Sequence, residues 1–129
     1  MSSNRVALVI LAMIVLAAVA LAYREASWRS QHALLEAPVA SPGGSIVAEV
    51  RMIEATSQQP YDKVVFLRRD WVPLLSLDSH FLFAGDCSEL KVSWMDAAHV
   101  SIGCRGVAAM PTYEDEDVLG VSARVFIEQ

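Results

Sequence analysis

Residues 87–104 read CSELKVSWMDAAHVSIGC and hold both cysteines of the chain, one at each end of the stretch. Within it, apolar and polar residues alternate over 90–95 (LKVSWM) and again over 99–104 (HVSIGC). Alternation with a period of two is typical of β-strands that bury one face. The stretch therefore predicts an antiparallel hairpin within a β-rich domain.

The register of this hairpin follows from the faces that its side chains occupy. Residues directly opposite each other in an antiparallel pair point to the same face. The two apolar sets share a face only if the loop has an odd number of residues, which favours a three-residue loop over 96–98 (DAA). Met95 is then opposite His99, and the expected apolar pairs are Trp94 with Val100, Val92 with Ile102 and Leu90 with Cys104.

Cys87 and Cys104 are interpreted as a disulfide. Two cysteines without CxxC spacing or a nearby histidine ligand make a poor zinc site, and a lone pair outside the cytoplasm usually oxidises. Two free buried thiols, or metal or redox chemistry, are the alternatives. In one uninterrupted hairpin Cys87 would lie beyond the partner of Cys104, so the chain must bend near 85–89 (GDCSE) to bring the Cα atoms within ~7 Å.

The N-terminus contains an apolar segment, residues 6–22, of seventeen residues without a charge. A transmembrane helix needs ~20 apolar residues and tolerates ~17, whereas the apolar region of a signal peptide usually has ~7–15. Ala20-Leu21-Ala22 also fits a signal-peptidase site, so cleavage is the alternative. The flanking Tyr23, Arg24 and Trp28 suit a membrane interface and favour an anchor that is retained.

The chain is expected to divide into an anchor (or signal peptide) over 1–22, a helical juxtamembrane segment and linker over 23–43, and an extracytoplasmic β domain over 44–129. The juxtamembrane helix could run from Arg24 to Glu36 before Pro38 ends it. The expected fold is mainly β, a small antiparallel sheet or sandwich behind an N-terminal transmembrane helix.

About six strands are expected, with a loop, or a loop that includes one helical turn, over 70–79. In the first strand, Ile46, Ala48, Val50 and Met52 are expected to face inward while Glu49 and Arg51 face water. The six expected strands lie within 45–54, 62–69, 80–84, 90–95, 99–104 and 120–128.

Charge and motif content exclude several function classes. Without the first 22 residues, which contain Arg5, nine of the ten Lys/Arg face fifteen Asp/Glu. Nucleic acid demands a basic face, so no nucleic-acid partner is expected. The acidic run 114–117 (EDED) lacks the spacing and glycine of a calcium loop and is interpreted as solvated.

No catalytic residue, cofactor or metal is expected. Residues 76–80 (SLDSH) supply Ser, Asp and His, but no nucleophile-elbow pattern surrounds them. The three histidines share no spacing and are interpreted as surface or half-buried residues: His32, His80 and His99.

Two phrases resemble parts of a known family. SPGGSIVAEVR (41–51) resembles the SP-x-G phrase that begins repeats in TolB-like β-propellers, and VSWMDAAHVSIGC (92–104) resembles the W-x-D strand pair found in the same context. Each occurs once, so length and lack of repetition exclude a propeller. In this order, behind an N-terminal span, they are similar to small uncharacterised bacterial single-pass membrane proteins with a domain of unknown function. The resemblance implies a β fold and no site.

The expected function is that of a non-enzymatic binding or accessory protein, tethered to the bacterial inner membrane with its C-terminal domain in the periplasm. The alternatives are an immunity-type inhibitor of a secreted toxin and a secreted soluble β domain after signal cleavage. The strands 62–69 and 120–128 are candidate edges for a protein partner. The C-terminal one is preferred because Phe126 falls on the outward parity, opposite to the expected inward face of Val121, Ala123, Val125 and Ile127. The residues expected on a partner surface are Phe126, Arg68, Arg69 and Trp71.

Overall fold

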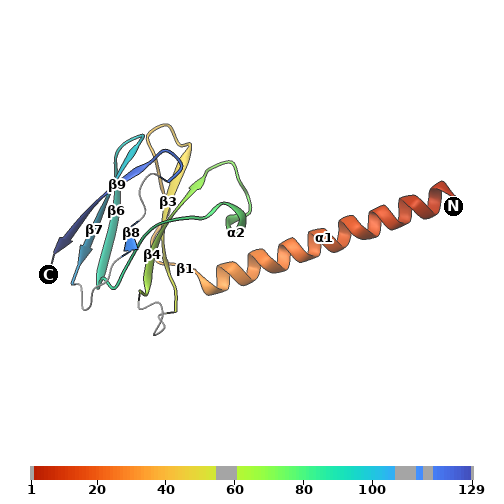
Figure 1. The fold of residues 1–129 in the computed structure, drawn as a ribbon, viewed down its shortest axis with the longest axis horizontal. Helices are drawn as coiled ribbons and strands as arrows, with labels where there is room; N and C mark the ends of the chain where they lie inside the picture. Colours follow the sequence, from red (N-terminus) through yellow and green to blue (C-terminus); the bar gives the residue numbers. More distant parts are fainter. Residues whose placement is uncertain (1, 55–60, 107–112, 115–117, 129) are drawn as a thin grey trace.

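The computed structural model describes residues 2–54, 61–106, 113–114 and 118–128. One long helix, α1 (Ser3–Gln31), leads into a β domain of two packed sheets, and the two chain termini lie at opposite ends of the molecule (Figure 1). A mainly β fold behind an N-terminal apolar helix is therefore confirmed.

The two sheets differ in their distance from α1. The sheet nearer the helix, called here the proximal sheet, has the order β1-β3-β4-β5-β8, and β2 also pairs with β3. The far sheet, called the distal sheet, has the order β6-β7-β9. The proximal strands are β1 (Ala33–Leu34), β2 (Val39–Ala40), β3 (Ile46–Met52), β4 (Lys63–Arg69), β5 (His80–Gly85) and β8 (Tyr113–Glu114). The distal strands are β6 (Glu89–Asp96), β7 (His99–Arg105) and β9 (Ser122–Glu128).

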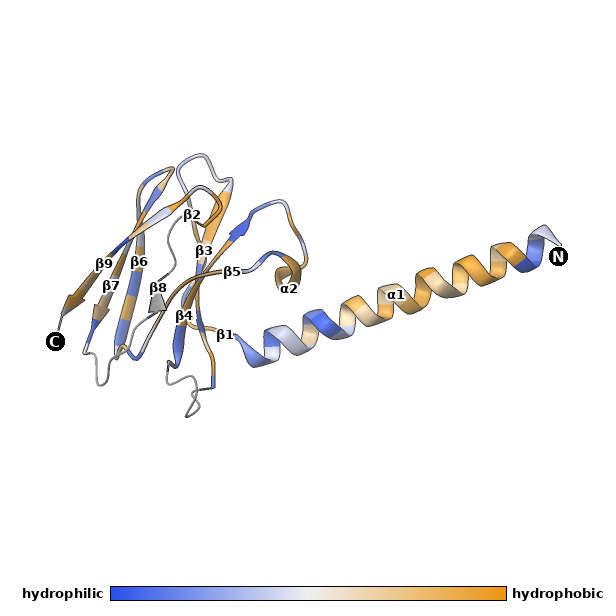
Figure 2. Ribbon diagram, viewed as in Figure 1, coloured by the Kyte–Doolittle hydropathy of each residue, from blue (hydrophilic) through white to orange (hydrophobic). Residues whose placement is uncertain are grey.

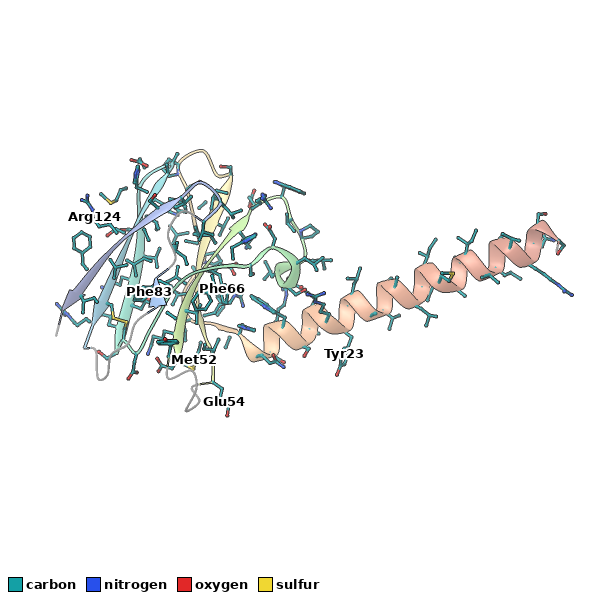
Figure 3. All side chains as sticks on the ribbon, viewed as in Figure 1. Tyr23, Met52, Glu54, Phe66, Phe83 and Arg124 are labelled. Carbon is teal, nitrogen blue, oxygen red and sulfur yellow. A yellow bond between two sulfur atoms is a disulfide. The ribbon has the colours of Figure 1, made fainter. Side chains whose placement is uncertain are left out.

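The main core fills the space between the sheets. Phe83 of β5 is fully buried there, whereas Phe66 of β4 lies on the helix side of the proximal sheet (Figure 3). Trp94 links the two layers, because its indole N–H donates to the carbonyl of Val39 at 2.9 Å. The molecule is thus layered in the order α1, proximal sheet, core, distal sheet.

The six expected strands are all present, but not all of their pairings are antiparallel. β9 pairs in parallel with β7, with Ser122 beside His99. After β7 the chain crosses to the proximal sheet, where it forms β8. It then returns to the distal sheet, and β9 starts beside the first residue of β7. Such a crossover makes neighbouring strands parallel, so the antiparallel expectation was wrong for β9.

The predicted hairpin register is confirmed in its three apolar pairs, Leu90 with Cys104, Val92 with Ile102 and Trp94 with Val100. The turn differs from the prediction, because Asp96 and not Met95 lies opposite His99. The ladder shifts between Trp94 and Asp96, so Met95 is the extra residue of a bulge. The bulge keeps both apolar sets on one face with a shorter turn.

Cys87 and Cys104 form a disulfide with a Cα–Cα distance of 5.4 Å. Cys87 lies between β5 and β6, where the chain turns from the proximal into the distal sheet, so the bend expected at 85–89 is present. Both cysteines are 1% exposed. The bridge therefore ties the start of β6 to the end of β7 inside the core.

The segment after α1 differs from the expected linker. The helix ends at Gln31 rather than near Glu36, and β1 and β2 both pair with β3. The backbone of Ala33 and Leu34 finds strand partners there, which a longer helix would forgo. The single helical turn expected within 70–79 is α2 (Leu75–Asp78).

Candidate interaction surfaces

The N-terminal part of α1 has the properties of a membrane span. α1 is the one helix in the described residues that is long and apolar enough to cross a membrane, and its apolar window is not buried against the domain. Its hydropathy falls toward the domain, and Tyr23 projects from the helix where this change begins (Figures 2 and 3). At ~1.5 Å per residue, seventeen residues span about 25 Å, close to the thickness of a hydrocarbon core.

The C-terminal end of α1 docks on the domain through Glu25, which is only 8% exposed. Its carboxylate accepts the backbone N–H groups of Leu75 at 2.7 Å and Ser76 at 2.8 Å, and Arg29 Nε donates to it at 3.1 Å. Burial alone would raise the pKa of Glu25, but the hydrogen bonds from Ser76, Arg29 and Leu75 lower this pKa to about 2. Glu25 lies beyond the apolar segment 6–22 and fixes α1 to α2.

One turn further along α1, an aromatic cluster covers the outer face of the proximal sheet. Trp28 stacks on His32 with a centroid distance of 4.4 Å and lies 5.6 Å from the ring of Phe66 on β4. Phe66 in turn meets Phe81 edge-on at 5.8 Å. These rings bury Val64 and other small residues on this face of the sheet. The helix end is therefore part of the domain's packing.

A buried charge cluster lies under this helix end, and it corrects the expectation that Glu49 and Arg51 face water. Glu49 and Arg51 are 2% and 6% exposed. The Glu49 carboxylate accepts from Arg51 Nε at 2.9 Å and from Arg68 Nε at 2.8 Å. Arg51 also donates to the His32 carbonyl at 2.7 Å and lies 4.9 Å from the ring centroid of Trp28. The outward-facing residues of β3 are covered because α1 ends above them.

The same packing engages Arg68 and Arg69, two residues of the expected partner surface, in ion pairs within the chain, although the Arg69 side chain stays 44% exposed. Arg68 is committed to Glu49. Arg69 donates from its backbone and from its guanidinium to Asp78, both at 2.7 Å. Trp71 is 76% exposed but follows β4 in the proximal sheet, whereas Phe126 lies on β9 in the distal sheet. The structure does not bring the four expected residues into one surface.

Asp78 and His80 lie in contact, with the ring Nε2 3.0 Å from the carboxylate. Burial would raise the pKa of Asp78, but hydrogen bonds from Arg69 and His80 and the Arg69 charge lower it. The buried Ser79 hydroxyl has no hydrogen-bond partner in the described structure, and the carboxylate is already shared with Arg69. The arrangement is a structural ion pair between β4, α2 and β5.

An apolar groove of about 750 Å³ opens beside the helix end. Its walls come from α1, β3, β4 and β5, and Trp28, Met52, Phe66 and Phe81 are among them. This volume lies within the ~300–1,000 Å³ range of ligand pockets. The interpretation of 114–117 as a solvated loop falls on positions outside the described residues, apart from the backbone of Glu114.

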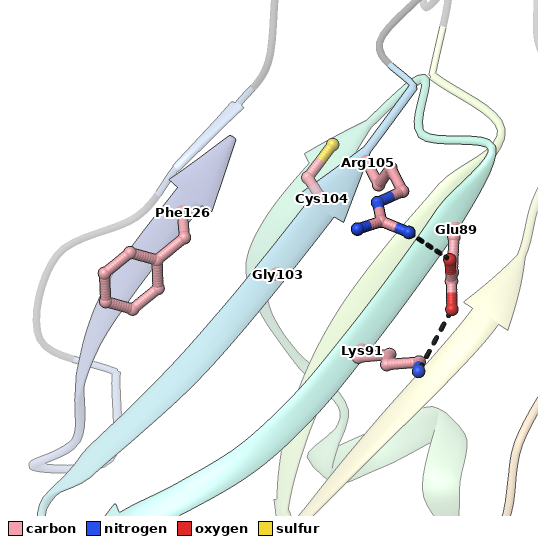
Figure 4. A pocket seen from close by; sticks show the side chains of 6 residues that line it. All are labelled: Glu89, Lys91, Gly103, Cys104, Arg105 and Phe126. Carbon is pink, nitrogen blue, oxygen red and sulfur yellow. Dashed lines mark ion pairs between the residues drawn. The ribbon is translucent and has the colours of Figure 1, made fainter. Parts of the chain in front are cut away.

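The outer face of the distal sheet is open. Phe126 is 51% exposed there, as its strand parity predicts, and its neighbour on β7 is Gly103. A Cβ atom at Gly103 would meet only the Lys91 carbonyl oxygen, at 3.9 Å, so the glycine leaves space beside the ring. A hollow of about 190 Å³ results, shown in Figure 4. Its polar rim includes Glu89, which pairs with Lys91 at 3.1 Å and Arg105 at 3.9 Å.

β9 is one of the two edges of the distal sheet: among the described strands, β9 and β6 each pair with β7 alone, and Phe126 lies on β9. The other candidate edge, 62–69, is wrong, because β4 is paired on both sides by β3 and β5. Ile127 was expected on the inward face of β9, yet it is 43% exposed near the end of this edge strand. An exposed Phe and an exposed Ile therefore occur together on a free edge.

Comparison of the chain with protein-family models, with curated proteins and with solved structures found no match. No group of three potential metal ligands occurs in the described part of the chain. The interaction surfaces must therefore be interpreted from their own geometry.

Sequence reasoning missed Glu25, whose one local signal is the Arg29 that follows it by four residues.

Proposed function

We propose that this chain is a single-pass protein of the bacterial inner membrane whose β domain lies in the periplasm and binds another protein, without catalytic activity of its own. The observation that carries the proposal is the contrast in cover between the two sheets. α1 and α2 cover part of the outer face of the proximal sheet and leave the groove beside the helix end, whereas no described element covers the outer face of the distal sheet, whose edge strand β9 carries the exposed Phe126.

Retention of the anchor is supported by the course of α1. The helix continues without interruption through Ala22 and Tyr23, so the candidate cleavage site lies inside regular helix. The charged and aromatic flank then leads directly into the docked segment at Glu25. N-terminal sequencing of the mature protein should begin at the start of the chain, and a sequence beginning at Tyr23 would overturn the anchor.

The mode of binding that fits this surface is strand addition at β9. A free edge offers backbone hydrogen bonds to an incoming strand, and flanking side chains provide specificity. Aromatic residues are enriched at the energetic centre of interfaces, and Phe126 beside the Gly103 hollow fits that role. The rim of Glu89, Lys91 and Arg105 gives the surrounding polar contacts.

The test compares two surface variants of the full chain in detergent-solubilised membranes. Phe126→Ser removes the aromatic anchor, and Gly103→Thr fills the hollow beside it with a residue that suits strands. Both should fold like the wild type and recover less of any bound protein. Equal recovery by all three chains would contradict the proposal. If Phe126→Ser unfolds, Phe126 belongs to a core and the surface is wrong.

A further inference from the structure

The backbone groups on the free edge of β9 can be assigned. The Ser122 N–H donates to the Ala98 carbonyl at 2.9 Å, so Ser122 turns its backbone groups toward β7. Successive residues of a strand point their N–H and C=O groups to alternate sides. Arg124 and Phe126 therefore also bond toward β7, and the groups on the open side belong to Ala123, Val125 and Ile127.

We propose that the protein bound at this edge is a second copy of the chain, with the two β9 strands antiparallel and Phe126 opposite Phe126 of the other copy. The inference rests on the proposed function, because it takes β9 as the docking edge. In this register Val125 and Ile127 face each other across the interface. Both present their backbone groups to the open side, so each such pair exchanges two hydrogen bonds. The two three-stranded sheets become one continuous sheet.

Charge selects this register over its neighbours. In an antiparallel pair of identical strands related by a two-fold axis, opposite residues point to the same face of the sheet only if the axis passes through a residue and not between two residues. An axis at Phe126 places Arg124 of each copy opposite position Glu128 of the other, and opposite charges stabilise such pairs. An axis at Arg124 would set the two Arg124 residues against each other, and an axis at Val125 would give no pair of opposite charges. β9 is self-complementary about Phe126.

Antiparallel neighbours in a sheet are related by a two-fold axis perpendicular to the sheet, and a dimer interface of this kind is closed. The distal sheet lies on the side of the domain away from α1 (Figure 1), so the proposed interface at β9 does not involve the anchor helix.

The apolar surface left on β9 fits a symmetric partner. Phe126 and Ile127 are 51% and 43% exposed in the single chain. In the dimer the two Phe126 rings become a cross-strand aromatic pair, which is among the stabilising pairs of antiparallel sheets. The charged positions on either side disfavour addition of an unrelated strand, because specificity at an edge needs groups that reject wrong partners.

Cysteine cross-linking of the full chain in isolated membranes tests the register. Phe126→Cys places two thiols on residues with a Cα separation of about 4.5 Å, expected for a pair that does not share hydrogen bonds, which is within disulfide range. Arg124→Cys on the same face is the matched control, because the register sets its two copies about 14 Å apart along the strands. Mild oxidation should give a reducible covalent dimer for the first variant alone. No dimer, or equal dimer in both, overturns the proposal.

Charge exchange provides a second readout on two differently tagged copies. Arg124→Glu should reduce their co-purification about tenfold, since two attractive pairs become repulsive. Adding Glu128→Arg should restore it. If the tagged copies never co-purify while Phe126→Ser still loses a different bound protein, the dimer is wrong and the proposed binding function stands. If Phe126→Ser loses nothing, the binding function fails as well.

Discussion

The outer faces of the two sheets have similar charged residues, but these residues differ strongly in how far they are buried. On β3 the residues that alternate with the core are Glu49 and Arg51, and on β6 they are Glu89 and Lys91. The first pair is almost fully buried under α1, whereas the second pair is exposed at the surface. Strand periodicity separates the two faces of a sheet, but it does not show which faces are covered.

The consequence of this difference is energetic. A surface ion pair contributes about 0–1 kcal/mol, because water screens the charges and solvates each partner alone. A buried charge that loses its partner is destabilising by several kcal/mol, because no water replaces the lost contact. Loss of one charged partner is therefore costly on the helix-covered face and costs little on the distal face.

The largest expected effect is at Glu49. Glu49→Ala leaves Arg51 and Arg68 without their shared carboxylate and should lower the free energy of unfolding by about 3–5 kcal/mol. The matched change on the open face, Glu89→Ala, should cost at most about 1 kcal/mol. Denaturant unfolding of both variants in mild detergent measures the difference. Similar small losses in the two variants would contradict the contrast between the faces.

The second effect concerns the distal sheet, whose outer face is not covered by any described helix or strand and which is tied by Cys87 and Cys104. Replacing both by Ala should lower the free energy of unfolding by about 3 kcal/mol, by analogy with loops of this size. Unfolded but unreduced protein should offer no thiol to an alkylating reagent, and two after reduction. Free thiols before reduction, in protein taken from an oxidising compartment, would refute the bridge.

Acid should weaken the helix-covered side first. The pKa of Glu25 is lowered from 4.5 to about 2 on folding, and that of Asp78 is lowered from 3.8. A lowered pKa adds stability that is complete above the unfolded value and is lost as pH falls through the folded value. Stability should therefore decline from about pH 4.5 toward pH 2.

Glu25→Gln isolates the contribution of the helix dock. The amide keeps the shape but loses the charge, and the free energy of unfolding at pH 7 should fall by about 2–3 kcal/mol. The decline below pH 4.5 should become shallower than in the wild type. Urea unfolding followed across this pH range provides the measurement, and an unchanged acid profile would mean that Glu25 does not hold the helix.

The smallest expected effect is at Phe126. Phe126→Ser should change the free energy of unfolding by no more than about 0.5 kcal/mol, since the ring is half exposed in the single chain. Phe66→Ser on the covered face should cost about 3–5 kcal/mol, because that ring is 7% exposed and packs against Trp28. Thermal unfolding of the two variants provides the measurement. A lower melting temperature for Phe126→Ser than for Phe66→Ser would contradict the contrast between the two faces.

Several features were accessible from local pattern. The period of two located the strands, and parity gave the pairing of Leu90, Val92 and Trp94 with their partners. Parity likewise gave the outward position of Phe126. These properties follow from backbone geometry, because each strand alternates its side chains whatever it packs against. The seventeen apolar residues of 6–22 similarly determine a membrane-length helix by their own hydropathy.

Other features depended on segments far apart in the chain. Glu49 is buried because α1 ends above β3, and Glu25 is buried because α2, fifty residues later, turns its backbone N–H groups toward it. β9 became a parallel edge because the preceding crossover passes through the other sheet. Hydrophobic periodicity does not predict these long-range contacts. Burial, charge pairing and edge exposure depend on which surfaces pack together in three dimensions.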